Sequence, residues 1–149
     1  MQSVEFVVPS RFECKSALPT DYTWAAQCQE VYDGDTITCV IDLGLQHFWR
    51  SQVRLAGLNA PEMRGADVIQ GERSRDYLRS RLLGKWCVLH CGRASLEKYG
   101  RVLARVFVSE GGRYVDLCRE MVEKGMAREY LVERDPTAAG LSEGQRIGV

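Results

Sequence analysis

The chain has 149 residues, of which 45% are hydrophobic and 27% charged, a length and composition typical of one globular domain with a single core. It has equal numbers of acidic and basic residues and no run of 18 or more apolar residues, so the sequence excludes a membrane-spanning helix. The charge is uneven, since residues 50–105 hold 12 Lys and Arg against 5 Asp and Glu. This central block either attracts phosphate backbones or forms a solvated helix face rich in arginine.

The spacing of apolar residues along the chain predicts both strands and helices. Alternation of apolar and polar residues predicts five strands, at residues 23–32, 36–41, 48–55, 86–91 and 102–108. The pair Asp33-Gly34 predicts a two-residue hairpin turn between the first two strands. Helical spacing predicts a helix over Glu72–Leu83 and a second helix that Asp116 caps and Gly125 ends.

This order of elements predicts a mainly β, α+β fold. Three strands, a helix, two strands and a helix fit a five-stranded β-barrel of the oligonucleotide/oligosaccharide-binding (OB) type with two to three α-helices. We expect residues 1–20 to form an irregular N-terminal arm, residues 21–135 to form the barrel domain and residues 136–149 to form a short C-terminal tail.

The six cysteines occupy positions expected of small buried apolar residues. Cys28 shares a strand face with Ala26, and Cys87 and Cys91 share another. His90 falls on the face opposite those two cysteines, which argues against a zinc site there. Reduced, buried thiols and the lack of a signal peptide predict a cytoplasmic protein, with a mature secreted form as the alternative.

Three short motifs carry most of the functional information: Asp33-Gly34-Asp35-Thr36, the run from Arg54 to Glu62, and Lys98-Tyr99-Gly100-Arg101. They supply acidic oxygens, two guanidinium groups and a lone carboxylate, which can cut a phosphodiester with a hard divalent cation. With Gly71-Glu72 and the stretch from Val115 to Ala127 in the same order, the chain resembles the staphylococcal nuclease (thermonuclease-like) family over roughly residues 23–132.

The resemblance implies a Ca²⁺ site formed by Asp35, Asn59 and the backbone carbonyl of Ala60. The family usually has Asp at the position of Asn59, so this site lacks one negative charge. We expect a weaker metal affinity and room for other divalent ions. The alternative for Asp35 is that it merely serves the turn, as we expect of Asp33.

The resemblance also assigns roles in catalysis and substrate binding. It implies that Glu62 positions or deprotonates the attacking water, and that Arg54 and Arg101 stabilise the charge on the scissile phosphate. Lys98 would contact a terminal phosphate, and Tyr99 a sugar or base. The alternative for Glu62 is a surface carboxylate that follows a proline turn. The alternative for Arg101 is an arginine that only follows the turn at Gly100.

The sequence therefore predicts a calcium-dependent nuclease that hydrolyses DNA and RNA with little sequence preference and leaves 3′-phosphates. We expect it to favour single strands, to be monomeric and to act without a membrane. The rival prediction is a non-catalytic OB barrel that binds nucleic acid or protein, which Asn59 and the neutral net charge support. Retention of both arginines and of Glu62 favours the enzyme.

Overall fold

The computed structural model describes residues 22–96 and 98–130. The expected N-terminal arm, the expected C-terminal tail and Cys14 lie outside the described residues. Within the described part, no helix is both long enough and apolar enough to span a membrane.

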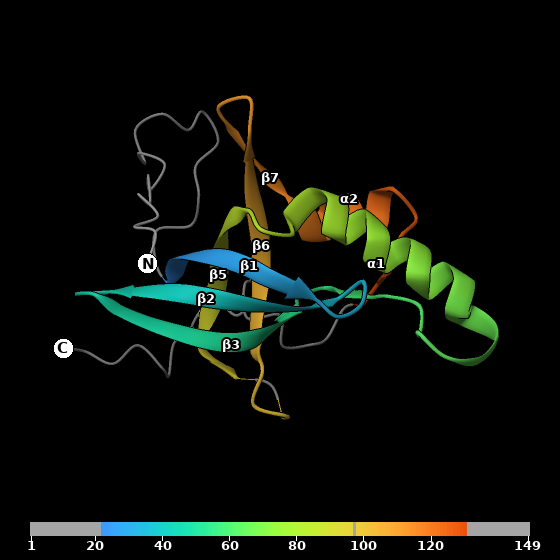
Figure 1. Cartoon of the computed structure of the whole chain (residues 1–149), viewed down its shortest axis with the longest axis horizontal. Coiled ribbons are helices and arrows are strands. Elements are labelled where there is room, and N and C mark those ends of the chain that lie inside the picture. The colour runs from blue at the N-terminus through green and yellow to red at the C-terminus, as the bar shows by residue number, and fades with distance from the viewer. Residues whose placement is uncertain (1–21, 97, 131–149) are drawn as a thin grey trace, which may run out of the picture.

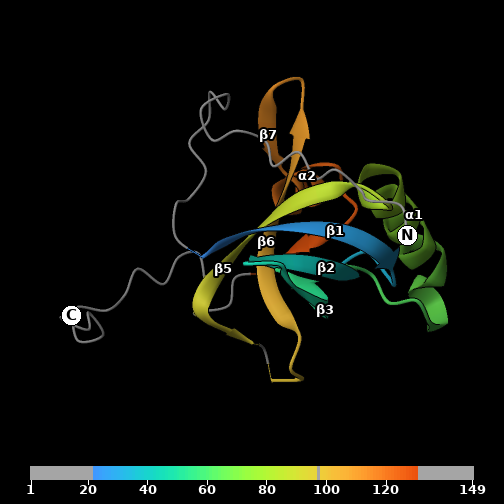
Figure 2. The ribbon, with the colours of Figure 1, turned by 60° about the vertical axis from the view of Figure 1, so that its left-hand side comes forward.

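Five strands close into a barrel (Figures 1 and 2). They are β1 (Thr23–Val31), β2 (Thr36–Gly44), β3 (His47–Leu55), β5 (Trp86–Leu96) and β6 (Val102–Glu110). Neighbours pair antiparallel in the order β3-β2-β1-β5-β6, and a parallel pairing of β3 with β6 closes the ring. The predicted five-stranded OB barrel is therefore confirmed.

Three shorter strands add to the barrel strands in the described residues. β7 (Arg113–Asp116) continues from β6 as a hairpin, and β4 (Leu58–Asn59) pairs with β8 (Arg128–Glu129) in a separate two-stranded sheet. The pairing of β4 with β8 brings the segment after β3 against the last described residues. It therefore places Asn59 directly opposite Arg128.

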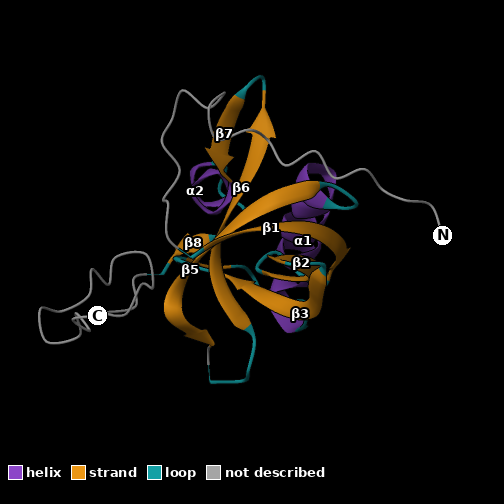
Figure 3. Cartoon of the chain, turned by 90° about the vertical axis from the view of Figure 1, so that its left-hand side faces the viewer, coloured by secondary structure: helices purple, strands orange, loops and turns teal. Residues whose placement is uncertain are grey.

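The two α-helices lie at the end of the barrel away from the turn between β2 and β3 (Figures 1 and 3). α1 spans Val68–Leu82 and follows a 3-10 turn, η1 (Gly65–Asp67), so it begins four residues before the predicted Glu72. α2 (Leu117–Glu123) begins where predicted, because the Asp116 carboxylate accepts a hydrogen bond from the Arg119 N–H at 3.1 Å.

The core fills the barrel and continues under both helices. The inward positions of β2 and β3 are buried as the alternation predicts, with Ile37, Cys39 and Ile41 from β2 facing Val53 and Leu55 from β3. Apolar residues of the helices, including Leu78, Leu82, Leu117 and Met121, complete it.

The described cysteines behave as buried apolar residues, as predicted. Cys28, Cys39, Cys87, Cys91 and Cys118 are all buried and free of disulfides. The hydrogen bond with Cys39, together with burial, raises the pKa of the Cys28 thiol, and burial raises the pKa of Cys118 to about 12. The thiols of Cys28 and Cys118 therefore stay protonated near neutral pH and are poor nucleophiles or ligands.

The predicted two-residue turn at Asp33-Gly34 is wrong. Four residues connect β1 to β2, and the N–H of Tyr32 donates to the carbonyl of Thr36 across the loop at 2.9 Å. Gly34 is not among the residues with positive φ. A glycine is needed there because a Cβ would run into the side chain of Ser74 on α1 and lie 2.7 Å from the Cβ of Ala60.

Candidate functional site

Asp35 and Arg54 form an ion pair where β2 begins and β3 ends. The Asp35 carboxylate lies 3.2 Å from Nη2 of Arg54, and only 13% and 15% of the two side chains are exposed. The same carboxylate accepts hydrogen bonds from the Thr36 hydroxyl at 3.1 Å and from the Ala60 N–H at 2.8 Å. Asp35 is therefore held by two separate segments, β3 and the residues after β4, and does more than shape its own turn.

Backbone carbonyls fix the direction of the Arg54 guanidinium. Nη1 donates to the carbonyl of Leu55 and Nη2 to the carbonyl of Leu58, both at 2.9 Å. Nη2 also donates to the side-chain oxygen of Asn59 at 2.5 Å. The same nitrogen thus lies against Asp35 and Asn59, the two side chains expected to bind a cation.

Asp35 and Asn59 supply oxygens of the kind that a hard cation binds, although both contact the same Arg54 nitrogen. Two ligands of one Ca²⁺ lie up to about 5 Å apart, because each Ca–O distance is about 2.3–2.6 Å. The side-chain oxygens of Asp35 and Asn59 share one Arg54 nitrogen, so they lie within about 6 Å of each other. The Ala60 N–H points toward Asp35 and donates a hydrogen bond to its carboxylate.

A cation here would need further ligands. Within the described residues, no group of three or more His, Cys, Asp or Glu side chains is placed to hold a metal ion. Water and a bound phosphate would have to supply the remaining oxygens, as is usual where carboxylates are few.

Arg101 reaches the same site from the turn between β5 and β6. Its Nη1 lies 3.4 Å from the Thr36 hydroxyl, and that hydroxyl donates to Asp35. The Tyr99 ring lies beside it, with Lys98 4.9 Å and Arg101 5.6 Å from the ring centre. The structure therefore brings Arg101, Thr36, Asp35 and Arg54 together, although they come from three motifs.

A family model described as staphylococcal nuclease homologue matches residues 52–145. The chain belongs to this family. Its barrel is the OB-type fold that the resemblance implied, and membership indicates a nuclease or a nucleic-acid-binding barrel. A comparison with curated proteins found no match. Asp35 and Thr36 precede the matched residues and reach the site through β2.

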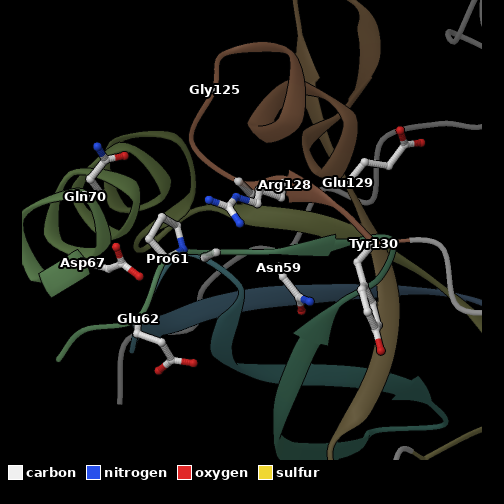
Figure 4. A pocket seen from close by; sticks show the side chains of 11 residues that line it. Asn59, Pro61, Glu62, Asp67, Gln70, Gly125, Arg128, Glu129 and Tyr130 are labelled. Atoms are coloured by element: carbon white, nitrogen blue, oxygen red, sulfur yellow. The ribbon is translucent and has the colours of Figure 1, made fainter. Parts of the chain in front are cut away.

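In this staphylococcal nuclease homologue, Glu62 stands beyond Asn59 on the segment that leads into α1. Its side chain is exposed, and in Figure 4 it points to the same side as Asn59. Gly71 of α1 fixes this segment, because a Cβ at Gly71 would run into the Glu62 carbonyl and lie 3.1 Å from that of Pro61. The helix thus positions the backbone that carries Glu62.

Asp33 serves the loop, as expected from the sequence. Its carboxylate accepts a hydrogen bond from the Asp35 N–H at 3.0 Å. Burial and the nearby charge of Asp35 raise the pKa of Asp33 to about 6. Asp33 is therefore less available than an ordinary carboxylate as a charged ligand.

Some arginines of the cationic block are occupied elsewhere. Arg79 donates to the carbonyl of Val31 at 3.2 Å, and Arg75 pairs with its neighbour Asp76 at 3.0 Å. Sequence reasoning missed the part of Thr36 in the site and the position of Arg128 opposite Asn59. The position of Thr36 directly after Asp35 could have revealed the first, but only the pairing of β4 with β8 reveals the second.

Proposed function

We propose that this protein is a metal-dependent phosphodiesterase that cleaves DNA and RNA with low overall sequence specificity and leaves 3′-phosphates. The observation that carries the proposal is the convergence of Arg54 and Arg101 on the segment formed by Asp35 and Thr36. Two planar guanidinium groups on one point suit a phosphoryl group, whose oxygens gain charge in the transition state.

The proposed roles follow from position. Asp35, Asn59 and the Ala60 carbonyl would hold a Ca²⁺ ion, which supplies positive charge beside the phosphate and lowers the pKa of a bound water. Glu62 would orient that water and accept its proton at the carboxylate. Arg54 and Arg101 would donate to the phosphoryl oxygens, and Arg54 is already oriented by the carbonyls of Leu55 and Leu58.

Substrate form follows from the loop between β5 and β6. Tyr99 is exposed between two cations and would lie against a base or sugar, and Lys98 would contact a phosphate. An exposed aromatic ring of this kind favours single-stranded DNA or RNA, because a duplex hides the faces of its bases. We propose that the protein acts as a monomer.

One observation favours the rival function, a non-catalytic nucleic-acid-binding barrel. Nη2 of Arg54 is bonded to Asn59, and the charge of Asp35 is offset by the same guanidinium. A barrel of this kind would bind strands through its cationic residues but would not cleave them.

Cleavage of a single-stranded oligonucleotide decides between the two functions. The protein is assayed with Ca²⁺, with Mg²⁺ or Mn²⁺, and with excess chelator. We expect metal-dependent cleavage that Glu62→Gln and Arg101→Ala each reduce about 100-fold or more. Arg113→Ala, which changes an exposed arginine on β7, is the matched control and should leave the rate unchanged. Binding of the oligonucleotide without cleavage under every ion would establish the rival instead.

A further inference from the structure

A recess opens beside Glu62, between the loop after β4, the start of α1 and β8 (Figure 4). Its volume is about 540 Å³, within the range of pockets that bind small molecules. The polar residues that line it are Asn59, Glu62, Asp67, Gln70, Arg128 and Glu129, with Tyr130 at its edge. Because it shares Asn59, Ala60 and Glu62 with the candidate site, whatever fills it lies next to the scissile bond.

The lining has two sides (Figure 4). Glu62, Asn59 and Tyr130 point to one side, and Asn59 and Glu62 also belong to the candidate site. Arg128 extends from β8 toward the other side, where Asp67 and Gln70 of the α1 region stand. If a nucleic-acid strand lies along the first side, a group attached to it would therefore contact Arg128 and Asp67 on the second side.

The charge of the lining as a whole selects against phosphate. Asp67, Glu62 and Glu129 would repel an anion, so the recess suits a neutral group with both donors and acceptors. In the described part of the chain, neither the Arg128 side chain nor the Asp67 side chain takes part in a hydrogen bond or a salt bridge. A guanidinium and a carboxylate thus stand on one cavity wall with their hydrogen-bonding capacity unused.

A nucleobase meets these requirements, and guanine meets them best. Arg donates two hydrogen bonds to the O6 and N7 acceptors of guanine, and a carboxylate accepts from the exocyclic amine of the same base. The Gln70 amide can serve as donor or acceptor beside them. Thymine offers no exocyclic amine to Asp67 and no paired acceptors to Arg128.

We propose that this recess binds the nucleobase adjacent to the cleaved bond, and that Arg128 and Asp67 give cleavage a preference for guanine at that position. The inference rests on the proposed function for its place in the reaction, although base binding itself does not. Recognition at one position is compatible with low overall specificity, because a single base contact leaves the neighbouring bases unread.

The first test sequences the ends of products from a single-stranded DNA library with a randomised centre. For the wild-type protein we expect guanine to be enriched about 5- to 100-fold at one fixed position from the cut, since a good bidentate contact discriminates by about 1–3 kcal/mol. Arg128→Ala and Asp67→Asn should each flatten this profile and leave the rate on oligothymidylate within about twofold. A flat wild-type profile, or one that both variants retain, overturns the inference.

The second test separates the inference from the proposed function. Binding of 2′-deoxyguanosine 5′-monophosphate and of thymidine 5′-monophosphate is measured by calorimetry without metal. We expect the guanine nucleotide to bind the wild-type protein and Arg113→Ala at least about fivefold more tightly than Arg128→Ala, and the thymine nucleotide to show no such difference. If the protein shows this binding pattern but does not cleave nucleic acid, the proposed function is refuted and base binding in the recess is supported. If it cleaves strands but binds both nucleotides equally in all variants, the recess fails alone.

Discussion

Replacing Asn59 by Asp should tighten Ca²⁺ binding about 10- to 100-fold. Asn59 and Asp35 stand on either side of Nη2 of Arg54, at 2.5 and 3.2 Å. Asp35 is the carboxylate that pairs with Arg54 among the described residues, and the guanidinium already offsets its charge. An added carboxylate therefore restores net negative charge where an ion would bind.

The magnitude follows from the charges and their exposure. A divalent ion and a carboxylate about 4 Å apart attract by about 8 kcal/mol at an effective dielectric constant of about 20. Most of this attraction is cancelled, because Asn59 is exposed and a new carboxylate must give up water and also pairs more strongly with Arg54. We expect about 1.4–2.8 kcal/mol to remain, which corresponds to the stated change in affinity.

Two measurements check this prediction on the same samples. Calorimetric titration with Ca²⁺ after chelator treatment gives the dissociation constant, and thermal unfolding with and without Ca²⁺ gives an independent stabilisation. Asn59→Ala is the matched control, because it removes the amide oxygen without adding charge and should weaken binding. If Asn59→Asp is folded and its dissociation constant stays within twofold of the wild-type value, the ligand assignment of Asn59 is refuted.

Three further predictions concern the surroundings of the site. Arg54→Ala should lower the free energy of unfolding by about 3 kcal/mol in urea titrations, because it leaves the mostly buried Asp35 unpaired; an unchanged midpoint would show that the ion pair does not support the fold. Gly71→Ala should cost about 1–3 kcal/mol and slow cleavage, because its Cβ meets the Glu62 carbonyl, whereas exposed Arg73→Ala on the same helix should do neither. Burial opposes ionisation of Glu120, but hydrogen bonds from Arg81 and Tyr77 outweigh it and lower its pKa. Its stabilising effect is therefore present at neutral pH and lost as the pH falls through that lowered value. Glu120→Gln should be less stable than wild type at pH 7 but nearly equal to it at a pH well below the lowered pKa of Glu120, and a pH-independent difference would contradict this assignment.

The barrel could be predicted from the sequence because its determinants are local. The alternation of Ile37, Cys39 and Ile41 sets which face of β2 is buried, whatever the neighbouring strands are. The cap at Asp116 likewise depends only on the N–H of Arg119, three residues later. Both features were predicted correctly for that reason.

The sequence-based predictions failed where the role of a residue depends on a contact with a residue far away in the sequence. Asp33-Gly34 has the composition of a hairpin turn, but Gly34 is required by the side chain of Ser74 on α1. The sequence could not show this, because nothing local places α1 against the loop. Arg128 was missed for the same reason, since only the β4–β8 pairing sets it opposite Asn59.

The position of Arg54 links the two halves of the proposed reaction. Its Nη1 and Nη2 groups are directed by the carbonyls of Leu55 and Leu58, while the contacts of Nη2 with Asp35 and Asn59 are the ones that a phosphate can replace. When Arg54 turns these donors to a phosphate, it leaves the oxygens of Asp35 and Asn59 without their counter-charge. Those oxygens then favour a cation, so phosphate and cation should each raise the affinity for the other. We therefore expect cation binding at Asn59 to depend on substrate, with the lowest affinity when no substrate is present.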